Sequence, residues 1–321
     1  MRAPADNRFH PHTPLGAGAE FDVIRRMLER WGPRARRIGD DAGVITALGD
    51  RALVVSTDTS VENVHFRAAW LTPQEIGYRA AAAALSDLAA MGAKPLGLLA
   101  ALGIPESWRV HIDAITDGIG DAAALVETPI IGGDMSRAGE LSLTFTVLGT
   151  TRDVLFRTAA RPGDGVYVTG RLGGPLRALR DFQEGRAPSA ADRERFARPL
   201  PRIREAMWLA EHGAASAIDV SDGLSSDLMH LASASRVAIV VDLDCVPTFE
   251  GATPLEAAAS GEEYEIIVTA PSDLDTAKFQ KRFGLELTRI GAVEHGSAEV
   301  RMSLAGEPVT ASPGFSHFAR S

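Results

Sequence analysis

The chain has 321 residues, of which 45% are hydrophobic, so it is long enough to form two domains with separate cores. Asp and Glu outnumber Lys and Arg by 42 to 33, and the formal net charge of −9 argues against a general nucleic-acid-binding protein. Cys245 is the single cysteine, which excludes an intrachain disulfide and fits a reducing compartment. With no apolar run of membrane-spanning length, we expect a cytoplasmic protein that does not bind membranes.

The first elements can be read from spacing and capping residues. Residues 1–18 hold Pro, His and Ala without an apolar core, so we expect a disordered leader rather than a secretory signal. Apolar residues recur at helical spacing from Phe21, and short strands are expected at 44–45 and 53–55. Thr72, Pro73 and Glu75 form a capping-box pattern, and Gly92 is a natural helix end, which predicts a helix over 72–91.

The rest of the chain alternates strands and helices. We expect strands at 96–102, 129–131 and 141–148, with a helix around 110–126. The turn-rich stretch 161–165 suggests a boundary between a domain at 19–155 and a second at 156–321. In the second half the pattern predicts strands at 166–169, 217–218, 237–243 and 264–268, helices at 176–182, 203–211 and 224–233, and a surface connection at 184–198. Such alternation indicates α/β or α+β layers.

Acidic residues end five apolar runs and stand beside Gly, Ser or Thr. The stretches are Ile38-Gly39-Asp40-Asp41, Val54-Val55-Ser56-Thr57-Asp58, Leu85-Ser86-Asp87, Ile130-Ile131-Gly132-Gly133-Asp134 and Ile218-Asp219-Val220-Ser221-Asp222. Any one of them is more simply a turn or a helix cap. Together they are harder to explain as turns, since Asp87 lies inside an alanine-rich helix where an unpaired carboxylate gains nothing. We expect most of them at strand ends, where clustered carboxylates would hold Mg²⁺ with a phosphorylated substrate.

Nucleotide-binding glycine motifs are missing or incomplete in this chain. No G-x-x-x-x-G-K-[ST] pattern occurs, and the glycine-rich stretch 170–174 lacks the full spacing of a dinucleotide turn. Phosphoryl transfer would therefore depend on metal ions and Arg for charge neutralisation. Arg157 is either a solvated charge or a phosphate clamp, and His65, beside Phe66, is either a structural residue or a ligand contact.

Several motifs, in this order, carry a family resemblance. They are Gly39-Asp40-Asp41, Ser56-Thr57-Asp58-Thr59, Val64-His65-Phe66, Leu85-Ser86-Asp87-Leu88-Ala89-Ala90-Met91-Gly92-Ala93, Ile131-Gly132-Gly133-Asp134, Arg161-Pro162-Gly163-Asp164, Asp219-Val220-Ser221-Asp222-Gly223-Leu224, Gly261-Glu262-Glu263-Tyr264-Glu265 and Gly314-Phe315-Ser316-His317-Phe318. With these motifs, the sequence from about residue 19 onward resembles the thiamine-monophosphate kinase family, which belongs to the group that includes aminoimidazole ribonucleotide synthetase.

The resemblance implies an enzyme that transfers the γ-phosphoryl group of ATP to thiamine monophosphate, the last step of thiamine diphosphate biosynthesis. It implies direct in-line attack by the substrate phosphate with several Mg²⁺ ions, and leaves a monovalent cation open. The implied fold has two α/β domains of the aminoimidazole ribonucleotide synthetase type, and the N-terminal domain forms a homodimer through its sheet. Because the acceptor is already an anion, positioning and charge neutralisation would supply most of the acceleration.

Residue roles follow from the same resemblance. It assigns metal binding to Asp41, Ser56, Thr57, Asp58, Asp87, Asp134, Asp219 and Asp222. It places ATP against Gly133, Asp134, Arg157 and Ser221, and thiamine monophosphate against His65, Glu262 and Phe315. The residues expected to carry catalysis are Asp58, Asp87 and Asp222.

The chain departs from the usual family pattern at a few positions. They are Arg79 in place of Lys, Ala84 in place of Asn, Met135-Ser136 in place of a Thr pair, and Ser260 and Glu263 in the stretch before Tyr264. None of them removes a proposed metal ligand. Two alternatives stay open: another ATP-using enzyme of the superfamily, of the purine-biosynthetic type, and a catalytically silent ATP-binding relative.

Overall fold

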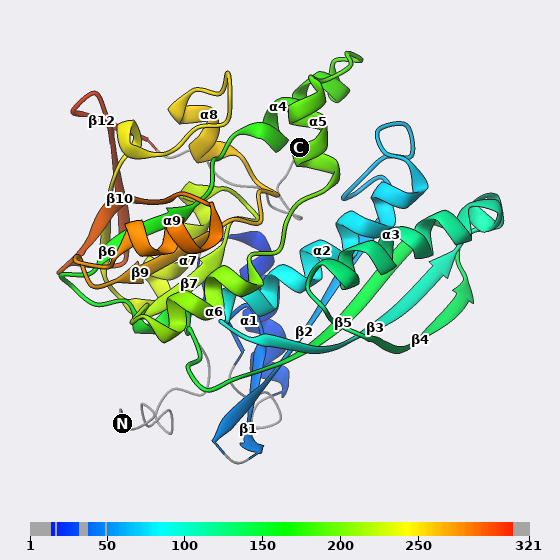
Figure 1. Ribbon diagram of the computed structural model, residues 1–321, viewed down its shortest axis with the longest axis horizontal. Coiled ribbons are helices and arrows are strands. Elements are labelled where there is room, and N and C mark those ends of the chain that lie inside the picture. The colour runs from blue at the N-terminus through cyan, green and yellow to red at the C-terminus, as the bar shows by residue number, and fades with distance from the viewer. Residues whose placement is uncertain (1–13, 17, 32–37, 49, 311–321) are drawn as a thin grey trace.

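The computed structural model describes residues 14–16, 18–31, 38–48 and 50–310. Phe315 and most of the predicted leader lie outside these residues, so the expectations for them stay predictions. Two sheets with their helices form the two halves of the molecule (Figure 1). None of the described helices has the length and apolar character needed to cross a membrane.

The N-terminal half contains a five-stranded sheet in the order β1-β2-β5-β3-β4. Neighbouring strands are antiparallel except β3 and β4, which are parallel. Helices α2 and α3 pack against one another and lie on one face of this sheet (Figure 1). The elements are α1 (Ala19–Trp31), β1 (Gly43–Leu48), β2 (Arg51–Val61), α2 (Pro73–Ala90), β3 (Lys94–Ile104), η3 (Glu106–His111), α3 (Ile112–Leu125), β4 (Ile130–Arg137) and β5 (Ser142–Thr151).

Helix α2 begins as the capping pattern predicts. The Thr72 side chain accepts a hydrogen bond from the Glu75 backbone N–H, and the Glu75 carboxylate accepts one from the Thr72 N–H at 2.7 Å. The close packing of α2 on α3 depends on glycine, because a Cβ on Gly77 would lie 2.1 Å from the Ile115 carbonyl oxygen. Because Gly and Ala have small side chains, α2 can lie buried between the sheet, α3 and the second half of the molecule.

The C-terminal half is built around a seven-stranded sheet in the order β12-β11-β8-β10-β6-β9-β7. Its neighbouring strands are antiparallel except β8 and β11. The elements are η4 (Arg157–Ala159), β6 (Gly165–Thr169), α4 (Gly174–Gln183), α5 (Ala190–Ala197), α6 (Ile203–Glu211), β7 (Ser216–Asp219), α7 (Leu224–Ser235), β8 (Ala238–Asp242), η5 (Leu243–Cys245), α8 (Pro254–Ala259), β9 (Ile266–Ala270), α9 (Thr276–Phe283), β10 (Leu287–Glu294), β11 (Glu299–Leu304) and β12 (Glu307–Val309).

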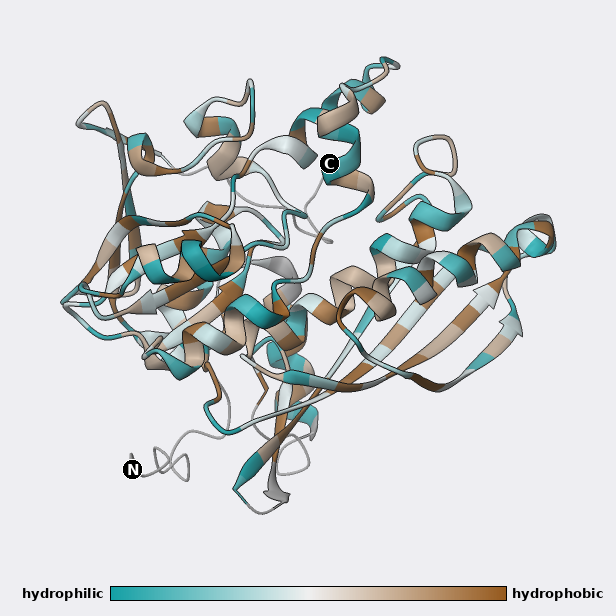
Figure 2. Cartoon of the chain, viewed as in Figure 1, coloured by the Kyte–Doolittle hydropathy of each residue, from teal (hydrophilic) through white to brown (hydrophobic). Residues whose placement is uncertain are grey.

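The two halves share part of their apolar core. Phe196 of α5 and Trp208 of α6 belong to the same buried cluster as Leu85 of α2 and Phe145 of β5. A second buried cluster lies within the C-terminal half, around α7 and the centre of the larger sheet. Figure 2 shows mostly apolar residues along the strands of the five-stranded sheet. Helix α2 is thus packed on both sides, which fixes the residues that it carries relative to β7.

Two sequence predictions about elements are wrong. The stretch 184–198 is not only a surface connection, since it contains α5, where Ser189 caps the helix and Phe196 is 1% exposed. Asp58 and Asp134 do not follow the ends of their strands, because β2 continues to Val61 and β4 to Arg137. Hydroxyl side chains extend β2 past its apolar run, and Thr57 bonds Thr146 of β5 at 2.9 Å.

Candidate active site

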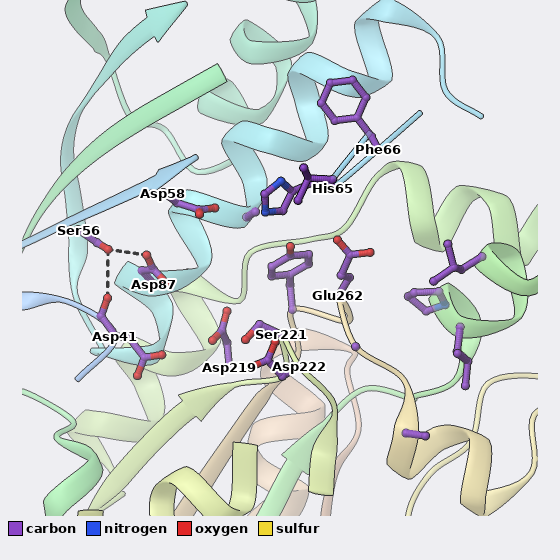
Figure 3. Close-up of a pocket in the computed structure, with 18 of the residues that line it drawn as sticks. Asp41, Ser56, Asp58, His65, Phe66, Asp87, Asp219, Ser221, Asp222 and Glu262 are labelled. Atoms are coloured by element: carbon purple, nitrogen blue, oxygen red, sulfur yellow. Dashed lines mark hydrogen bonds between the residues drawn. The ribbon is translucent and has the colours of Figure 1, made fainter. Parts of the chain in front are cut away.

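A cavity of about 670 Å³ lies between the two halves and is lined by both of them (Figure 3). The N-terminal half contributes the loop before β1, strand β2 with the loop after it, and α2. The C-terminal half contributes η4, α4 and the loops that precede α7 and β9. Eleven of the site residues expected from the sequence line it: Asp41, Ser56, Thr57, Asp58, His65, Asp87, Arg157, Asp219, Ser221, Asp222 and Glu262.

Three carboxylates meet at one end of this cavity. Asp41 precedes β1, Asp87 lies on α2 and Asp219 ends β7, and one oxygen of each lies within 4.8 Å of the others. Asp58 on β2 and Asp222 after β7 line the same end (Figure 3). An all-oxygen set of acidic ligands at this spacing fits Mg²⁺, so the donor chemistry agrees with the expected cation.

Two serines orient the carboxylates through short hydrogen bonds. The Ser56 hydroxyl donates to Asp87 Oδ2 at 2.5 Å and lies 3.1 Å from the Asp41 carbonyl oxygen, which also accepts from it. The Ser86 hydroxyl donates to Asp219 Oδ2 at 2.6 Å in the buried contact between α2 and β7. Ser86 and Asp87 are adjacent on α2. Asp87 bonds Ser56 of the N-terminal half and Ser86 bonds Asp219 of the C-terminal half, so α2 connects the acidic residues of the two halves.

The carboxylates raise one another's proton affinity. Burial raises the pKa of Asp87 well above its usual value, and the charges of Asp219 and Asp41 raise it further. Burial and the Asp41 charge raise the pKa of Asp219 to about 7. Within the described residues, neither Asp87 nor Asp219 forms an ion pair with Lys, Arg or His. The group is thus short of positive charge, as a cation site is before the cation binds.

Arg157 supplies the nearest protein cation. Its Nε donates to Asp41 Oδ2 at 2.8 Å, and its second guanidinium nitrogen donates to Asp41 Oδ1 at 2.5 Å. Its backbone N–H donates to Asp40 Oδ1 at 2.9 Å. Both side chains of the Arg157–Asp41 pair are largely buried, so Arg157 is not a solvated surface charge.

The loop after β2 presents His65 to the cavity. His65 Nδ1 accepts from the Val61 backbone N–H at 3.0 Å, so a neutral ring carries its proton on Nε2. The His65 carbonyl oxygen accepts from Arg79 of α2 at 3.4 Å, and the Arg79 guanidinium forms an ion pair with Glu262. Arg79 also donates to the Phe196 carbonyl oxygen at 2.8 Å and lies over the Phe196 ring.

Apolar side chains line another part of the cavity, together with the polar side chains of Arg67 and Gln183. Val64 and Trp70 line it from the N-terminal half, and Leu176 and Leu179 of α4 line it from the C-terminal half. The Trp70 ring stacks on Phe182, also on α4, with 5.6 Å between ring centroids. The cavity therefore combines an acidic end with a part suited to an apolar or aromatic group.

Gly133 and Asp134 do not line this cavity. Both lie on β4, an edge strand whose residues are all exposed. The register pairs Asp58 with Phe145, Phe145 with Ala100 and Ala100 with Gly133, so these four share a face of the sheet. Asp134 is the next residue and points to the opposite face, which α2 and α3 do not cover.

Three polar residues to which the sequence analysis assigns no role lie in or behind the site. Ser86 donates to Asp219, Asp40 accepts from the backbone N–H of Arg157, and Asp227 of α7 is buried behind the loop that carries Asp222. Ser86 and Asp40 belong to the motifs noted in the sequence, so adjacency to Asp87 and Asp41 was an available signal. Asp227 follows Asp222 by five residues, and only the fold reveals its contacts.

Two protein-domain families match the two halves of the chain. The family described as "AIR synthase related protein, N-terminal domain" matches residues 39–151. Its counterpart, "AIR synthase related protein, C-terminal domain", matches residues 161–302. The chain, with its two-sheet fold, thus belongs to the AIR synthase related proteins.

Individual relatives define the family more narrowly. Thiamine-monophosphate kinase of Pyrococcus horikoshii is 36% identical over 285 residues, which cover 86% of this chain and 89% of the relative. Thiamine-monophosphate kinase of Escherichia coli K12 is 35% identical over 329 residues, which cover 94% of this chain and 99% of the relative. The structure described as "AaThiL complexed with AMPPCP and TMP" matches with a TM-score of 0.80 and 28% identity, covering 94% of this chain and 97% of that one. The chain therefore belongs to the thiamine-monophosphate kinase family.

Proposed function

We propose that this chain transfers the γ-phosphoryl group of ATP to the phosphate of thiamine monophosphate. The observation that carries the proposal is the meeting of Asp41, Asp87 and Asp219 at one end of a cavity that is lined elsewhere by apolar and aromatic side chains of both halves. Thiamine monophosphate has the matching polarity, with a phosphate at one end and aromatic rings at the other. Relatives named for this activity, and a similar structure described as holding AMPPCP and TMP, support the assignment.

The acidic residues would hold Mg²⁺ in this reaction. Asp41, Asp87 and Asp219 form the centre of the set, with Asp58 and Asp222 beside them. When bound, Mg²⁺ supplies the positive charge that neutralises the phosphates of both substrates. Ser56, Thr57 and Asp134 stay predicted ligands from the resemblance, as do the contacts of Gly133 and Ser221 with ATP.

The protein's own groups would bind and orient the two substrates. Arg157 adds positive charge beside Asp41, where a phosphate of ATP could replace the carboxylate as its partner. His65 offers an Nε2 donor toward the acceptor, and Glu262 lines the same part of the cavity. Since the attacking group is a phosphate oxygen that is already ionised, catalysis needs no strong general base, and we assign Asp58, Asp87 and Asp222 to charge placement.

We also propose that the protein is a cytoplasmic homodimer with a domain boundary at residues 155–156. The face of the N-terminal sheet that points away from α2 and α3 carries apolar and hydroxyl side chains. The strand register places Ile45, Leu53 and Leu148 on this face. A second copy related by a two-fold axis would cover this face with the same residues. Each Asp134 would then point toward the partner subunit. Light scattering of the purified protein should give twice the chain mass of 34.0 kDa.

A product assay tests the activity. We expect ADP and thiamine diphosphate to form only when ATP, Mg²⁺ and thiamine monophosphate are all present, with little product from free thiamine. Asp58→Ala and Asp87→Ala should nearly abolish turnover, whereas Asp117→Ala, at an exposed position on α3, should not change it. Strong turnover of free thiamine would overturn the acceptor assignment. Binding of Mg·ATP without turnover of any phosphorylated acceptor would indicate a silent relative instead.

A further inference from the structure

A buried carboxylate lies directly behind the candidate site without lining it. Asp227 is in the first turn of α7 and is 1% exposed. Its Oδ2 accepts three hydrogen bonds from consecutive backbone N–H groups: from Ser221 at 3.1 Å, from Asp222 at 3.2 Å and from Gly223 at 3.1 Å. These three residues belong to the loop between β7 and α7, residues 220–223, which begins directly after Asp219.

The same loop is held on its carbonyl side by the segment that precedes β9. The Ser221 carbonyl oxygen accepts from the Glu262 N–H at 2.7 Å, and the Val220 carbonyl oxygen accepts from the next two N–H groups along that segment. Gly223 has φ of +116°, a conformation that most residues rarely adopt. The Val220 N–H donates to the Glu265 carbonyl oxygen at 2.8 Å, so the other three amides of this unusual loop share one carboxylate oxygen.

The location of Asp227 is costly for stability. Its carboxylate lies near Asp222 and His230, with one ligand atom of each within 4.8 Å of the others. His230 does not supply a positive charge at neutral pH, because burial lowers its pKa to about 4. Among the residues that the structure describes, Asp227 has no ion-pair partner. A buried carboxylate close to other carboxylates costs free energy that three backbone hydrogen bonds only partly offset.

We propose that Asp227 is the positioning residue of the phosphate site: it holds the β7–α7 loop in the conformation that presents Asp219 and Asp222 to the cavity together. The proposal rests on the proposed function, in which both carboxylates hold Mg²⁺. It assigns Asp227 no contact with substrate or metal, since Asp227 is not among the residues that line the cavity. Its effect passes through the three amides that it accepts from.

The test compares two substitutions that differ in one property. Asp227→Asn keeps an acceptor oxygen of similar shape, whereas Asp227→Ala removes it. Asp192→Asn is the control, because Asp192 is also a 1% exposed carboxylate, on α5, and does not line the cavity. Thermal unfolding of all three variants shows which of them retain the fold.

Amide hydrogen exchange without ligands gives the first readout. Peptides that contain residues 220–223 should exchange much faster in Asp227→Ala, moderately faster in Asp227→Asn, and as in the wild type in Asp192→Asn. Calorimetric titration with Mg²⁺ alone should show affinity weakened roughly 10- to 100-fold in Asp227→Ala, with a smaller loss in Asp227→Asn. Neither readout requires turnover, so both remain decisive if thiamine monophosphate is not the acceptor.

Kinetics give the second readout. With ATP, Mg²⁺ and thiamine monophosphate, Asp227→Ala should lower kcat roughly 10- to 100-fold and raise the Mg²⁺ concentration needed for half-maximal rate. Its KM for thiamine monophosphate should change little. The proposal is overturned if Asp227→Ala keeps wild-type loop exchange and Mg²⁺ affinity. It is also overturned if both Asp227 variants only lower the unfolding temperature while loop exchange and Mg²⁺ affinity stay unchanged.

Discussion

Arg157 holds Asp41 with both arms of its guanidinium, through contacts of 2.8 and 2.5 Å between nitrogen and carboxylate oxygen. Asp41 is at the same time within 4.8 Å of Asp87 and Asp219, measured between ligand oxygens. A residue expected to bind ATP is thus the counter-ion of a residue expected to bind the metal. The charge balance of the site without cations depends on this pair.

Replacing Arg157 should therefore lower the free energy of unfolding more without Mg²⁺ than with it. Arg157→Gln leaves the Asp41 carboxylate buried beside two others, which should lower the free energy of unfolding by about 3 kcal/mol in metal-free buffer. Added Mg²⁺ should recover part of this loss because it pairs with the same carboxylates. Chemical denaturation with and without Mg²⁺ measures both values. Equal losses in the two buffers would contradict the shared role of Arg157 and the cation.

Asp58 and Asp134 offer a test of a site shared between subunits. They lie on opposite faces of one sheet, so Asp134 can reach a cavity only in a partner that covers its face. We expect Asp58→Asn and Asp134→Asn each to lower turnover at least 100-fold. When the two inactive proteins are mixed and allowed to exchange subunits, mixed dimers should regain part of the activity, since one of their two sites is intact. The two variants should be made with different tags so that mixed dimers can be purified and assayed.

If mixed dimers stay inactive although they form, Asp134 does not serve the partner's cavity. If Asp134→Asn is fully active, it is not a metal ligand at all. A double variant carrying both substitutions in one chain is the matched control, because every site of its mixed dimers with either single variant lacks Asp58 or Asp134 and no activity should return.

The pKa of Asp219 predicts a pH dependence of stability. In the folded protein this pKa is about 7, against 3.8 as the ordinary value, so the folded state binds more protons than the unfolded state between these pH values. The contribution of Asp219 to unfolding free energy should therefore fall as pH rises from about 4 to about 7. Asp219→Asn removes this dependence, so the variant should gain stability over the wild type across this range, by a few kcal/mol at pH 7 without metal.

Denaturation of both proteins in buffers from pH 4 to 8 measures this difference. Titrating groups remote from Asp219 cancel in the comparison, whereas Asp87 does not, because the Asp219 charge raises its pKa. Parallel curves for the two proteins would contradict the raised pKa. Added Mg²⁺ should reverse the order at pH 8, where the ionised wild-type carboxylate binds the cation and the amide does not.

Arg79 should affect the acceptor side of the site. Its guanidinium contacts the His65 carbonyl oxygen, the Phe196 carbonyl oxygen and the Glu262 carboxylate, which the single ammonium group of lysine cannot reproduce in the same geometry. Arg79→Lys should raise KM for thiamine monophosphate about tenfold and leave KM for ATP within about twofold. Steady-state kinetics with each substrate varied in turn measures the split.

The matched control for Arg79 is Arg193→Lys. Arg193 connects the same two helices, α5 and α2, through Glu75, which does not line the cavity, whereas Arg79 contacts the lining residues His65 and Glu262. Both variants remove a guanidinium contact between these helices, so a general loosening of their packing would change both proteins alike. An equal rise of KM for both substrates in Arg79→Lys would contradict a role on the acceptor side.

Local sequence signals predicted the elements that carry the site. The pattern Thr72, Pro73 and Glu75 gives the capping box of α2 as observed, and the helix at 203–211 has the bounds of α6. These signals work because capping and helical periodicity depend on residues a few positions apart. Periodicity does not reveal the helix at 190–197, because half of its residues are charged and its one large buried apolar residue, Phe196, cannot define a helical period.

The sequence by itself determined which carboxylates were candidates, because acidic residues beside Gly, Ser and Thr are visible without a structure. Only the tertiary structure decided which of them meet. Ser86 bonds Asp219 across 133 positions of sequence, a contact that exists because α2 packs against both sheets. Asp134 has the same local pattern as Asp58, yet strand register turns it to the other face. The residue types beside each carboxylate are fixed by the local sequence. Which carboxylates are buried together, and toward which face of the sheet each one points, depends on packing between distant segments.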